Sequence, residues 1–160
     1  MESPAWMFDE TDRRLMSLAL DAARGAAEQG EVPVGAVVAR GGEPVATAGN
    51  RRRTPPDPAG HAEILVLRQA ARQVGDWRLE GCSLYVTLEP CPMCVAACRQ
   101  ARLDLVVYGA PDPSLGACGS VVDLAADPRL GPPIAARGGL LADESSALLR
   151  TFFAKRRQTS

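Results

Sequence analysis

The sequence predicts a single α/β domain in which helices cover both faces of a central, mixed, five-stranded sheet. Three observations indicate this three-layer arrangement. A helical segment near the start precedes two short strands joined by Gly41-Gly42, helical and strand-like segments then alternate, and no repeat or long linker divides the chain. Its 160 residues suffice for one domain with its own core. We therefore expect one domain over residues 1–160, with an ordered core from about residue 8 to about residue 157.

The first elements follow from periodicity and turn residues. Residues 9–29 have helical period, and Gly30 is a plausible end. The expected apolar stripe comprises Leu15, Leu18, Ala19, Ala22 and Ala26. Residues 32–39 and 44–49 read as strands on either side of the Gly41-Gly42 turn, which predicts an antiparallel hairpin.

Residues 50–58 are rich in proline, which removes backbone hydrogen-bond donors, so we expect a loop there. Residues 61–73 return to helical period, and residues 82–88 form an apolar strand. Pro92 suits the first turn of a helix that runs to about Ala101. A further strand is expected at 103–108.

The last third is harder to assign. A Gly/Pro-rich loop covers 109–120, a short helix is expected at 121–125, and a short strand at 134–137. Residues 140–157 predict a closing helix. Its acidic residues come early and its basic residues late, as the helix dipole favours.

Composition narrows the class of protein. The formal net charge is -1 and the sequence pI is about 5.9, so no overall basic charge points to nucleic acid, although local basic patches remain possible. No secretory leader is expected at the N-terminus, and no apolar run is long enough for a bilayer. Five cysteines, an odd number, favour a reducing compartment. We expect a cytoplasmic protein without a membrane segment.

Two short motifs carry the chemistry. Cys91 and Cys94 have the C-x-x-C spacing that lets two sulfurs reach one ion, and His61 can add a nitrogen. Three protein ligands with an open fourth position are typical of catalytic zinc. Glu63 is placed to move the protons of a water at that position. The joint pattern H-x-E and P-C-x-x-C is typical of zinc-dependent nucleobase deaminases.

Both motifs are expected at helix starts. Side chains of a helix tilt toward its N-terminus, so His61 and Glu63 can reach one point beyond the helix end. The same argument applies to Cys91 and Cys94 around Pro92. A helix N-terminus also favours thiolate over thiol.

Simpler interpretations exist for each residue alone. A single histidine before a helix usually caps it or packs in the core, and a C-x-x-C pair can be a redox pair or two small buried residues. The combination with Glu63 and Pro90 in register favours the metal site. Cys98, one turn after Cys94, would close the catalytic position if it were a fourth ligand. We expect packing roles for Cys82, Cys98 and Cys118, core or flanking roles for Trp6 and Trp77, and no chemistry for Glu89.

The chain resembles bacterial tRNA-specific adenosine deaminases of the TadA type, within the cytidine and deoxycytidylate deaminase superfamily. The matching segments cover nearly the whole chain beyond the first few residues. They are residues 31–36, Asn50, Asp57-Pro58, 61–64, 84–94, 109–112, 116–120, 139–144 and 152–157.

The resemblance implies the cytidine-deaminase-like fold and hydrolytic conversion of the wobble adenosine to inosine in an arginine tRNA with an ACG anticodon. It further implies a homodimer that binds the anticodon stem-loop across both subunits, with one zinc ion per subunit. By matching motif, His61, Cys91 and Cys94 would hold Zn²⁺ and Glu63 would shuttle protons. Asn50 would contact the flipped base, and Val34 would line its pocket.

Two basic runs give this substrate partial support from the residues themselves. Arg51-Arg52-Arg53 follows Asn50, and Lys155-Arg156-Arg157 follows two phenylalanines. Proteins hold single-stranded RNA loops by neutralising their phosphates with basic side chains and by stacking their bases on aromatic rings. A solvated loop and a dipole-complementing helix end are the alternative interpretations.

Some residues depart from the family pattern, all in regions expected to meet RNA. They are Gly60, the Thr54-Pro55-Pro56 segment, Pro111, Pro113 and Thr151. Two other functions therefore stay open. One is deamination of a free base or nucleoside, of guanine or cytosine type. The other is a non-catalytic RNA-binding subunit with structural zinc, against which Glu63 argues.

Overall fold

The computed structural model describes residues 3–159, so residues 1, 2 and 160 of the predicted domain lie outside the described residues. One five-stranded sheet forms within the described part, in the order β2-β1-β3-β4-β5. Its strands are β1 (Gly35–Arg40), β2 (Glu43–Gly49), β3 (Cys82–Leu88), β4 (Leu105–Ala110) and β5 (Ala135–Arg137). β1 runs antiparallel to β2 and β3, whereas β3, β4 and β5 are parallel. The predicted mixed sheet is confirmed.

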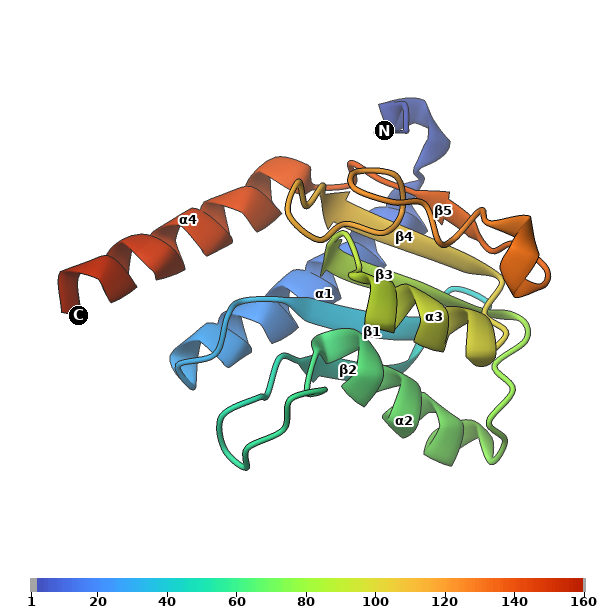
Figure 1. Cartoon of the computed structure of the whole chain (residues 1–160), viewed down its shortest axis with the longest axis horizontal. Helices are drawn as coiled ribbons and strands as arrows, with labels where there is room; N and C mark the ends of the chain where they lie inside the picture. The colour runs from blue at the N-terminus through green and yellow to red at the C-terminus, as the bar shows by residue number, and fades with distance from the viewer. Residues whose placement is uncertain (1–2, 160) are drawn as a thin grey trace.

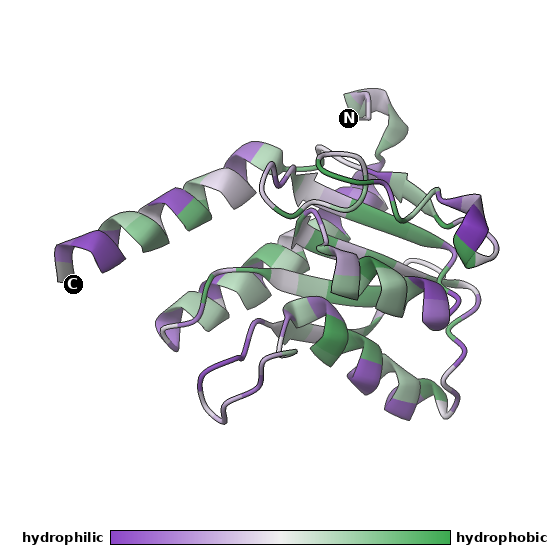
Figure 2. Cartoon of the chain, viewed as in Figure 1, coloured by the Kyte–Doolittle hydropathy of each residue, from purple (hydrophilic) through white to green (hydrophobic). Residues whose placement is uncertain are grey.

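Helices cover both faces of the sheet, as predicted (Figure 1). α1 and α4 pack on one face, and α2 and α3 on the other. The helices are α1 (Glu10–Glu28), α2 (Ala62–Val74), α3 (Pro92–Gln100) and α4 (Ala142–Thr159), with 3-10 turns η1 (Ala5–Met7) and η2 (Pro128–Leu130). Hydropathy follows these layers in Figure 2, where the inner strands are mostly green and the loop between β2 and α2 is pale to purple.

Alternation along β3 divides the core between the two faces of the sheet. Leu84 and Val86 belong to the cluster under α2 and α3, whereas Tyr85 belongs to the cluster under α1. Successive side chains of a strand point to opposite faces, so one apolar strand supplies both clusters. Burial on both faces explains the continuous apolar run at residues 82–88, and the strand predicted there is confirmed with the same bounds.

Gly35 brings α1 directly onto the start of β1. A Cβ atom at this position would lie 1.9 Å from the backbone oxygen of Ala19 and 2.5 Å from the backbone nitrogen of Ala23. Only a residue without a side chain allows the helix and strand to approach so closely. This contact fixes the position of the segment just before β1, and Val34 belongs to that segment.

Several predicted bounds differ from the structure. The strand expected at 32–39 begins at Gly35, because Pro33 has no N–H and the N–H of Val34 donates to the oxygen of Val32. The strand expected at 103–108 lies at 105–110. The strand starts later because the chain first closes the C-terminus of α3. There Arg102 has a φ of 62°, and the N–H of Leu103 donates to the oxygen of Cys98.

The short helix expected at 121–125 is wrong. The N–H groups of Val121 and Val122 both donate to the oxygen of Gly116, and Cys118 forms an isolated bridge with Asp123. Local hydrogen bonds to the preceding loop thus replace a helix.

Burial corrects two further expectations. In α1 the structure buries Met16, Leu20 and Ala23 in addition to Leu15, Ala19 and Ala26, whereas Leu18 and Ala22 are half-buried. Of the core or flanking roles expected for Trp6 and Trp77, the core role is wrong, because these side chains are 82% and 56% exposed. Among the described residues, no helix is both long enough and apolar enough to span a bilayer.

Candidate active site

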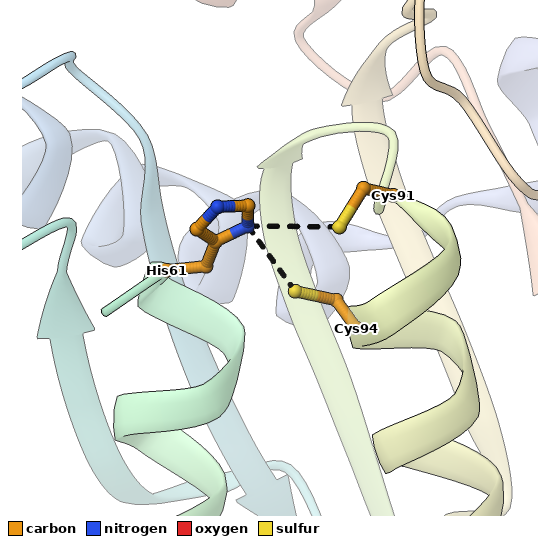
Figure 3. Close-up of side chains that lie close together, drawn as sticks. All are labelled: His61, Cys91 and Cys94. Carbon is orange, nitrogen blue, oxygen red and sulfur yellow. Dashed lines mark hydrogen bonds between the residues drawn. The ribbon is translucent and has the colours of Figure 1, made fainter. Parts of the chain in front are cut away.

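The structure brings His61, Cys91 and Cys94 together at the starts of two neighbouring helices (Figure 3). His61 is the N-cap of α2, and Cys91 is the N-cap of α3. Pro92 occupies the first turn of α3, where its missing N–H costs no hydrogen bond, and Cys94 follows in the same turn. The expectation that two helix N-termini converge on one point is confirmed.

The spacing of the three donor atoms fits a tetrahedral zinc ion. The Nδ1 atom of His61 lies 3.6 Å from the Sγ atom of Cys91 and 3.5 Å from that of Cys94. Bonds of about 2.3 Å to sulfur and about 2.0 Å to nitrogen, at tetrahedral angles, separate such atoms by about 3.5 Å. One imidazole and two thiols are also a donor set that zinc prefers. These residues could therefore hold the ion and leave a fourth position open.

The surroundings of the two cysteines shift their pKa values in opposite directions. The thiol of Cys94 donates toward the sulfur of Cys91, and with His61 and a backbone N–H it lowers the pKa of Cys91 to about 4. The same hydrogen bond, together with burial, raises the pKa of Cys94 above its ordinary value. The pKa of His61 is raised, chiefly by its hydrogen bond with Cys91. The lowered pKa of Cys91 favours its thiolate, which is the form that binds a metal ion.

Glu63 lies in the first turn of α2, and it is only 4% exposed. Burial raises the pKa of its carboxyl to about 7, although the charge of His61 acts in the opposite direction. A carboxyl group that gains and loses a proton near neutral pH has the property a general acid-base catalyst needs. Its side chain also forms a hydrogen bond with Cys94, so Glu63 lies beside the candidate ligands, and its role in proton transfer stays a prediction.

Asn50 and Val34, the predicted substrate-binding residues, lie together at the entrance to β1. The backbone N–H of Asn50 donates to the oxygen of Val34 over 3.0 Å. The side-chain oxygen of Asn50 accepts the backbone N–H of Ala62 over 2.8 Å, which connects the loop to the residue between His61 and Glu63. Val34 is buried. Their contact with a base stays a prediction.

Sequence reasoning missed Glu31, which orders the arginine-rich loop. This carboxylate is 5% exposed and accepts the backbone N–H groups of Arg52 and Arg53, each over 3.0 Å. Gly60 closes the same loop, because a Cβ atom there would lie 2.2 Å from the oxygen of Arg51. The glycine at this position, a departure from the family pattern, therefore has a steric reason in this chain.

Sequence reasoning also missed the role of Glu89. Its buried carboxylate accepts the backbone N–H groups of Asp112, Cys118 and Ser120 and the hydroxyl of Ser120. Burial works to raise the pKa of Glu89, but these hydrogen bonds outweigh it and lower the pKa. An acidic residue between an apolar strand and Pro90 was the available signal, since a charge so placed needs buried partners.

The remaining cysteines pack in the interior, as expected. Cys82 and Cys98 are fully buried, and burial raises the pKa of Cys98 well above its ordinary value. Cys118 is also buried, and burial raises its pKa to about 12. Within the part of the chain that the structure describes, the candidate metal cluster contains His61, Cys91 and Cys94 only.

Comparison with known proteins agrees with this geometry. Residues 9–110 match the family model of the cytidine and deoxycytidylate deaminase zinc-binding region. A tRNA-specific adenosine deaminase of Bacillus subtilis is 42% identical over 147 residues, which covers 92% of this chain and 91% of that protein.

Solved structures show the same relationship. A structure from a study of A-to-I editing by tRNA:A34 deaminases at the wobble position has a TM-score of 0.82 and 45% identity, covering 85% of this chain and 99% of the other. The guanine deaminase of Bacillus subtilis is more distant. It has a TM-score of 0.61 and 33% identity over 65% of this chain and 66% of its own.

The fold and the site together define a zinc-binding hydrolytic deaminase of the cytidine and deoxycytidylate deaminase superfamily. The tRNA-specific adenosine deaminases that match nearly the full length of this chain narrow the class of deaminase. This chain belongs to the tRNA-specific adenosine deaminase family of the TadA type.

Proposed function

We propose that residues 1–160 form a single deaminase domain in which His61, Cys91 and Cys94 hold one zinc ion per subunit. The spacing of the three donors and their position at two helix N-termini support this assignment. Bound zinc would lower the pKa of a water molecule toward neutrality and so supply the nucleophile for hydrolysis.

Glu63 moves the protons of the reaction. Its carboxylate accepts a proton from the attacking water and delivers it to the N1 atom of the purine ring. It then carries the second proton to the exocyclic amine, which leaves C6 as ammonia, so adenosine and water give inosine and ammonia. Burial of Glu63 excludes bulk water from this proton path, and its pKa of about 7 suits both directions of transfer.

The substrate is the wobble adenosine in the anticodon loop of an arginine tRNA with an ACG anticodon. The observation that carries this assignment is that the two basic runs meet beside the site. Arg52, Arg53 and Arg156 line one surface cavity of about 340 Å³, together with Glu31 and Asp57. Arg52 is also close enough for its charge to act on His61. The arginines gathered in this cavity suit the phosphates of a loop whose bases are splayed out.

Asn50 contacts the flipped adenine, and Val34 lines its pocket. Because the Asn50 oxygen is already held by Ala62, its amide nitrogen is the atom directed to the base. Phe152, half-buried and stacked near the guanidinium of Arg156, adds an aromatic surface at the basic end of α4.

The enzyme acts as a homodimer that binds the tRNA stem-loop across both subunits. An apolar cavity of about 360 Å³ lies between α2 and α3, lined by Ile64, Leu67 and Ala97 among others, and the exposed Trp77 borders it. Such a surface is suited to a second copy. Sedimentation of the purified chain tests the dimer.

The enzyme works in the cytoplasm, because mature tRNA, its proposed substrate, is found there.

The decisive experiment measures inosine in a transcript of arginine tRNA with an ACG anticodon, with the Glu63→Ala protein alongside. Conversion at the wobble position by the wild type alone is the expected result. No conversion by zinc-loaded, folded protein would remove the tRNA assignment and leave the deaminase chemistry in place.

The competing substrate is a free base or nucleoside, and similarity to guanine deaminase and the mildly acidic pI favour it. Salt distinguishes the two. Binding of an anticodon stem-loop through several phosphates weakens steeply with salt, whereas binding of guanine does not.

A further inference from the structure

Glu89 follows the last residue of β3 and precedes Pro90 and the proposed ligand Cys91. Its carboxylate is buried, and hydrogen-bond donors surround both of its oxygens. The Oε1 atom accepts the N–H of Asp112 over 3.0 Å and the hydroxyl of Ser120. The Oε2 atom accepts the N–H groups of Cys118 and Ser120 over 2.9 and 3.1 Å.

All four donors belong to one loop, residues 112–120, which follows β4. The loop is compact in its own right: the side chain of Asp112 accepts the N–H groups of Ser114 and Leu115, and the N–H of Gly116 donates to the oxygen of Asp112. The loop can therefore shift as a unit if its attachment is lost.

A second attachment places this loop beside the metal centre. The N–H of Ala117 donates to the oxygen of Pro90 over 2.8 Å, one residue before Cys91. In Figure 1 the loop after β4 passes close to the start of α3, where Cys91 and Cys94 lie. Leu115, which is 58% exposed, projects from the same loop.

Gly116 shows how closely the loop packs on the carboxylate. A Cβ atom at this position would lie 2.4 Å from the Cδ and Oε2 atoms of Glu89 and 2.5 Å from Oε1. No side chain fits between the loop and Glu89. The carboxylate thus meets the loop through both of its oxygens and through direct contact.

We propose that Glu89 is a positioning residue that holds loop 112–120 against the Pro90-Cys91 turn, so that the loop forms one wall of the substrate site. This inference rests on the proposed deaminase function. Both oxygens of the carboxylate accept hydrogen bonds, so an amide cannot replace it: its NH₂ group would face N–H donors. The side chain acts through the loop, and it does not touch the reacting atoms.

The test uses the zinc-loaded full chain with Glu89→Gln, Gly116→Ala and Ser120→Ala. The first changes the carboxylate, the second displaces the loop while the carboxylate stays intact, and the third removes one hydroxyl. Glu31→Gln is the matched control, because Glu31 is also a buried carboxylate that orders a different loop. Amide hydrogen exchange of residues 111–121, zinc content, and kcat and KM for the stem-loop are measured.

We expect faster exchange at Asp112, Cys118 and Ser120 in Glu89→Gln and Gly116→Ala, with zinc content as in the wild type. KM should rise about tenfold or more while kcat changes less, because a displaced wall weakens substrate positioning. Ser120→Ala should change the amide exchange rate and KM in the same direction but by less. The proposal can therefore still be tested if Glu89→Gln fails to fold. Glu31→Gln should leave exchange of 111–121 unaltered.

Unchanged exchange of the loop in all three variants would overturn the proposal. So would loss of zinc without faster exchange, since Glu89 would then support the ligand Cys91 alone. The exchange measurement needs no substrate. Failure of the wild type to deaminate tRNA would therefore refute the proposed function separately.

Discussion

The side-chain oxygen of Asn50 accepts the backbone N–H of Ala62 over 2.8 Å, so a loop residue is fixed to the first turn of the helix that bears Glu63. The backbone N–H groups at a helix start have no partner within the helix. Asn50 satisfies one of them from outside and in return gains a defined orientation. A single amide side chain can thereby order the helix start and direct its nitrogen to a substrate.

Substitution of Asn50 should separate these two roles. Asn50→Asp keeps the acceptor for Ala62 but removes the donor, so we expect normal zinc content and melting temperature with activity reduced about tenfold or more. Asn50→Ala should lose both and also be destabilised by about 1 kcal/mol. Inosine formation and thermal unfolding of both variants check this. Full activity of Asn50→Asp would show that the amide nitrogen does not contact the base.

Glu63→Gln should abolish most of the activity while the fold and metal site persist. The amide has nearly the same shape but cannot accept and return a proton, and loss of a general acid-base typically costs about 10²–10⁴-fold in rate. The neutral amide also avoids burying a charge at this 4% exposed position, so thermal stability should not fall. Single-turnover kinetics and zinc analysis measure the two effects. Zinc loss in this variant would contradict a purely proton-transferring role.

Removal of zinc should inactivate the enzyme, lower its melting temperature and expose the thiol of Cys91. A ligand that binds only the folded chain stabilises it, and readdition of zinc should restore both properties. After chelation, iodoacetamide should label Cys91 first, since its pKa of about 4 makes it a thiolate, while the buried Cys82 and Cys98 stay unlabelled. Mass spectrometry of the labelled peptides gives the order. Equal labelling of Cys91 with and without zinc would exclude it as a ligand.

Tyr85 should make the fold sensitive to alkaline pH. Its hydroxyl donates to Asp12 over 2.6 Å, and burial followed by this hydrogen bond raises its pKa above the ordinary value. The unfolded chain releases the tyrosine proton near about pH 10 and the folded chain only at higher pH. The contribution of Tyr85 is therefore complete below about pH 10 and is lost as pH rises beyond it.

Tyr85→Phe tests this directly by denaturant unfolding at about pH 8 and about pH 11, on either side of the ordinary tyrosine pKa. The variant should be less stable at the lower pH by about 1 kcal/mol because the hydrogen bond is gone. It should lose less stability than the wild type between the two pH values. Equal losses in both proteins would show that Tyr85 titrates normally in the folded chain.

Gly35 and Gly25 should respond oppositely to alanine. At Gly35 a Cβ atom meets the backbone of Ala19 and Ala23, which cannot move cheaply, so Gly35→Ala should destabilise by about 1–3 kcal/mol or more. Gly25 lies within α1, and among the described residues no atom outside the adjacent residues and the nearby backbone of the helix lies within 4 Å of the point that its Cβ atom would occupy. Gly25→Ala should therefore stabilise by about 0.5–1 kcal/mol. Chemical denaturation measures both free energies of unfolding. A tolerated Gly35→Ala would contradict the close packing of α1 on β1.

Sequence patterns predicted the fold class, the strand at 82–88 and the metal-site constellation, each for a local reason. The C-x-x-C spacing, the H-x-E pair and Pro92 all act within one helix turn, and an apolar run needs only its own residues to indicate a buried strand. The error at 121–125 arose where hydrogen bonds to Gly116, several residues earlier in the loop, decide the conformation. Short segments without periodicity give no signal of such bonds.

What the sequence by itself determined is the chemistry: which residues could hold zinc, which could move a proton, and which family carries them. Only the tertiary structure decided how Glu31 and Glu89 order the two loops beside the site, and that Arg52, Arg53 and Arg156 share one cavity. The physical reason is distance along the chain. A buried carboxylate must find hydrogen-bond donors, but its own sequence context says only that it needs them, while the fold decides which distant N–H groups supply them.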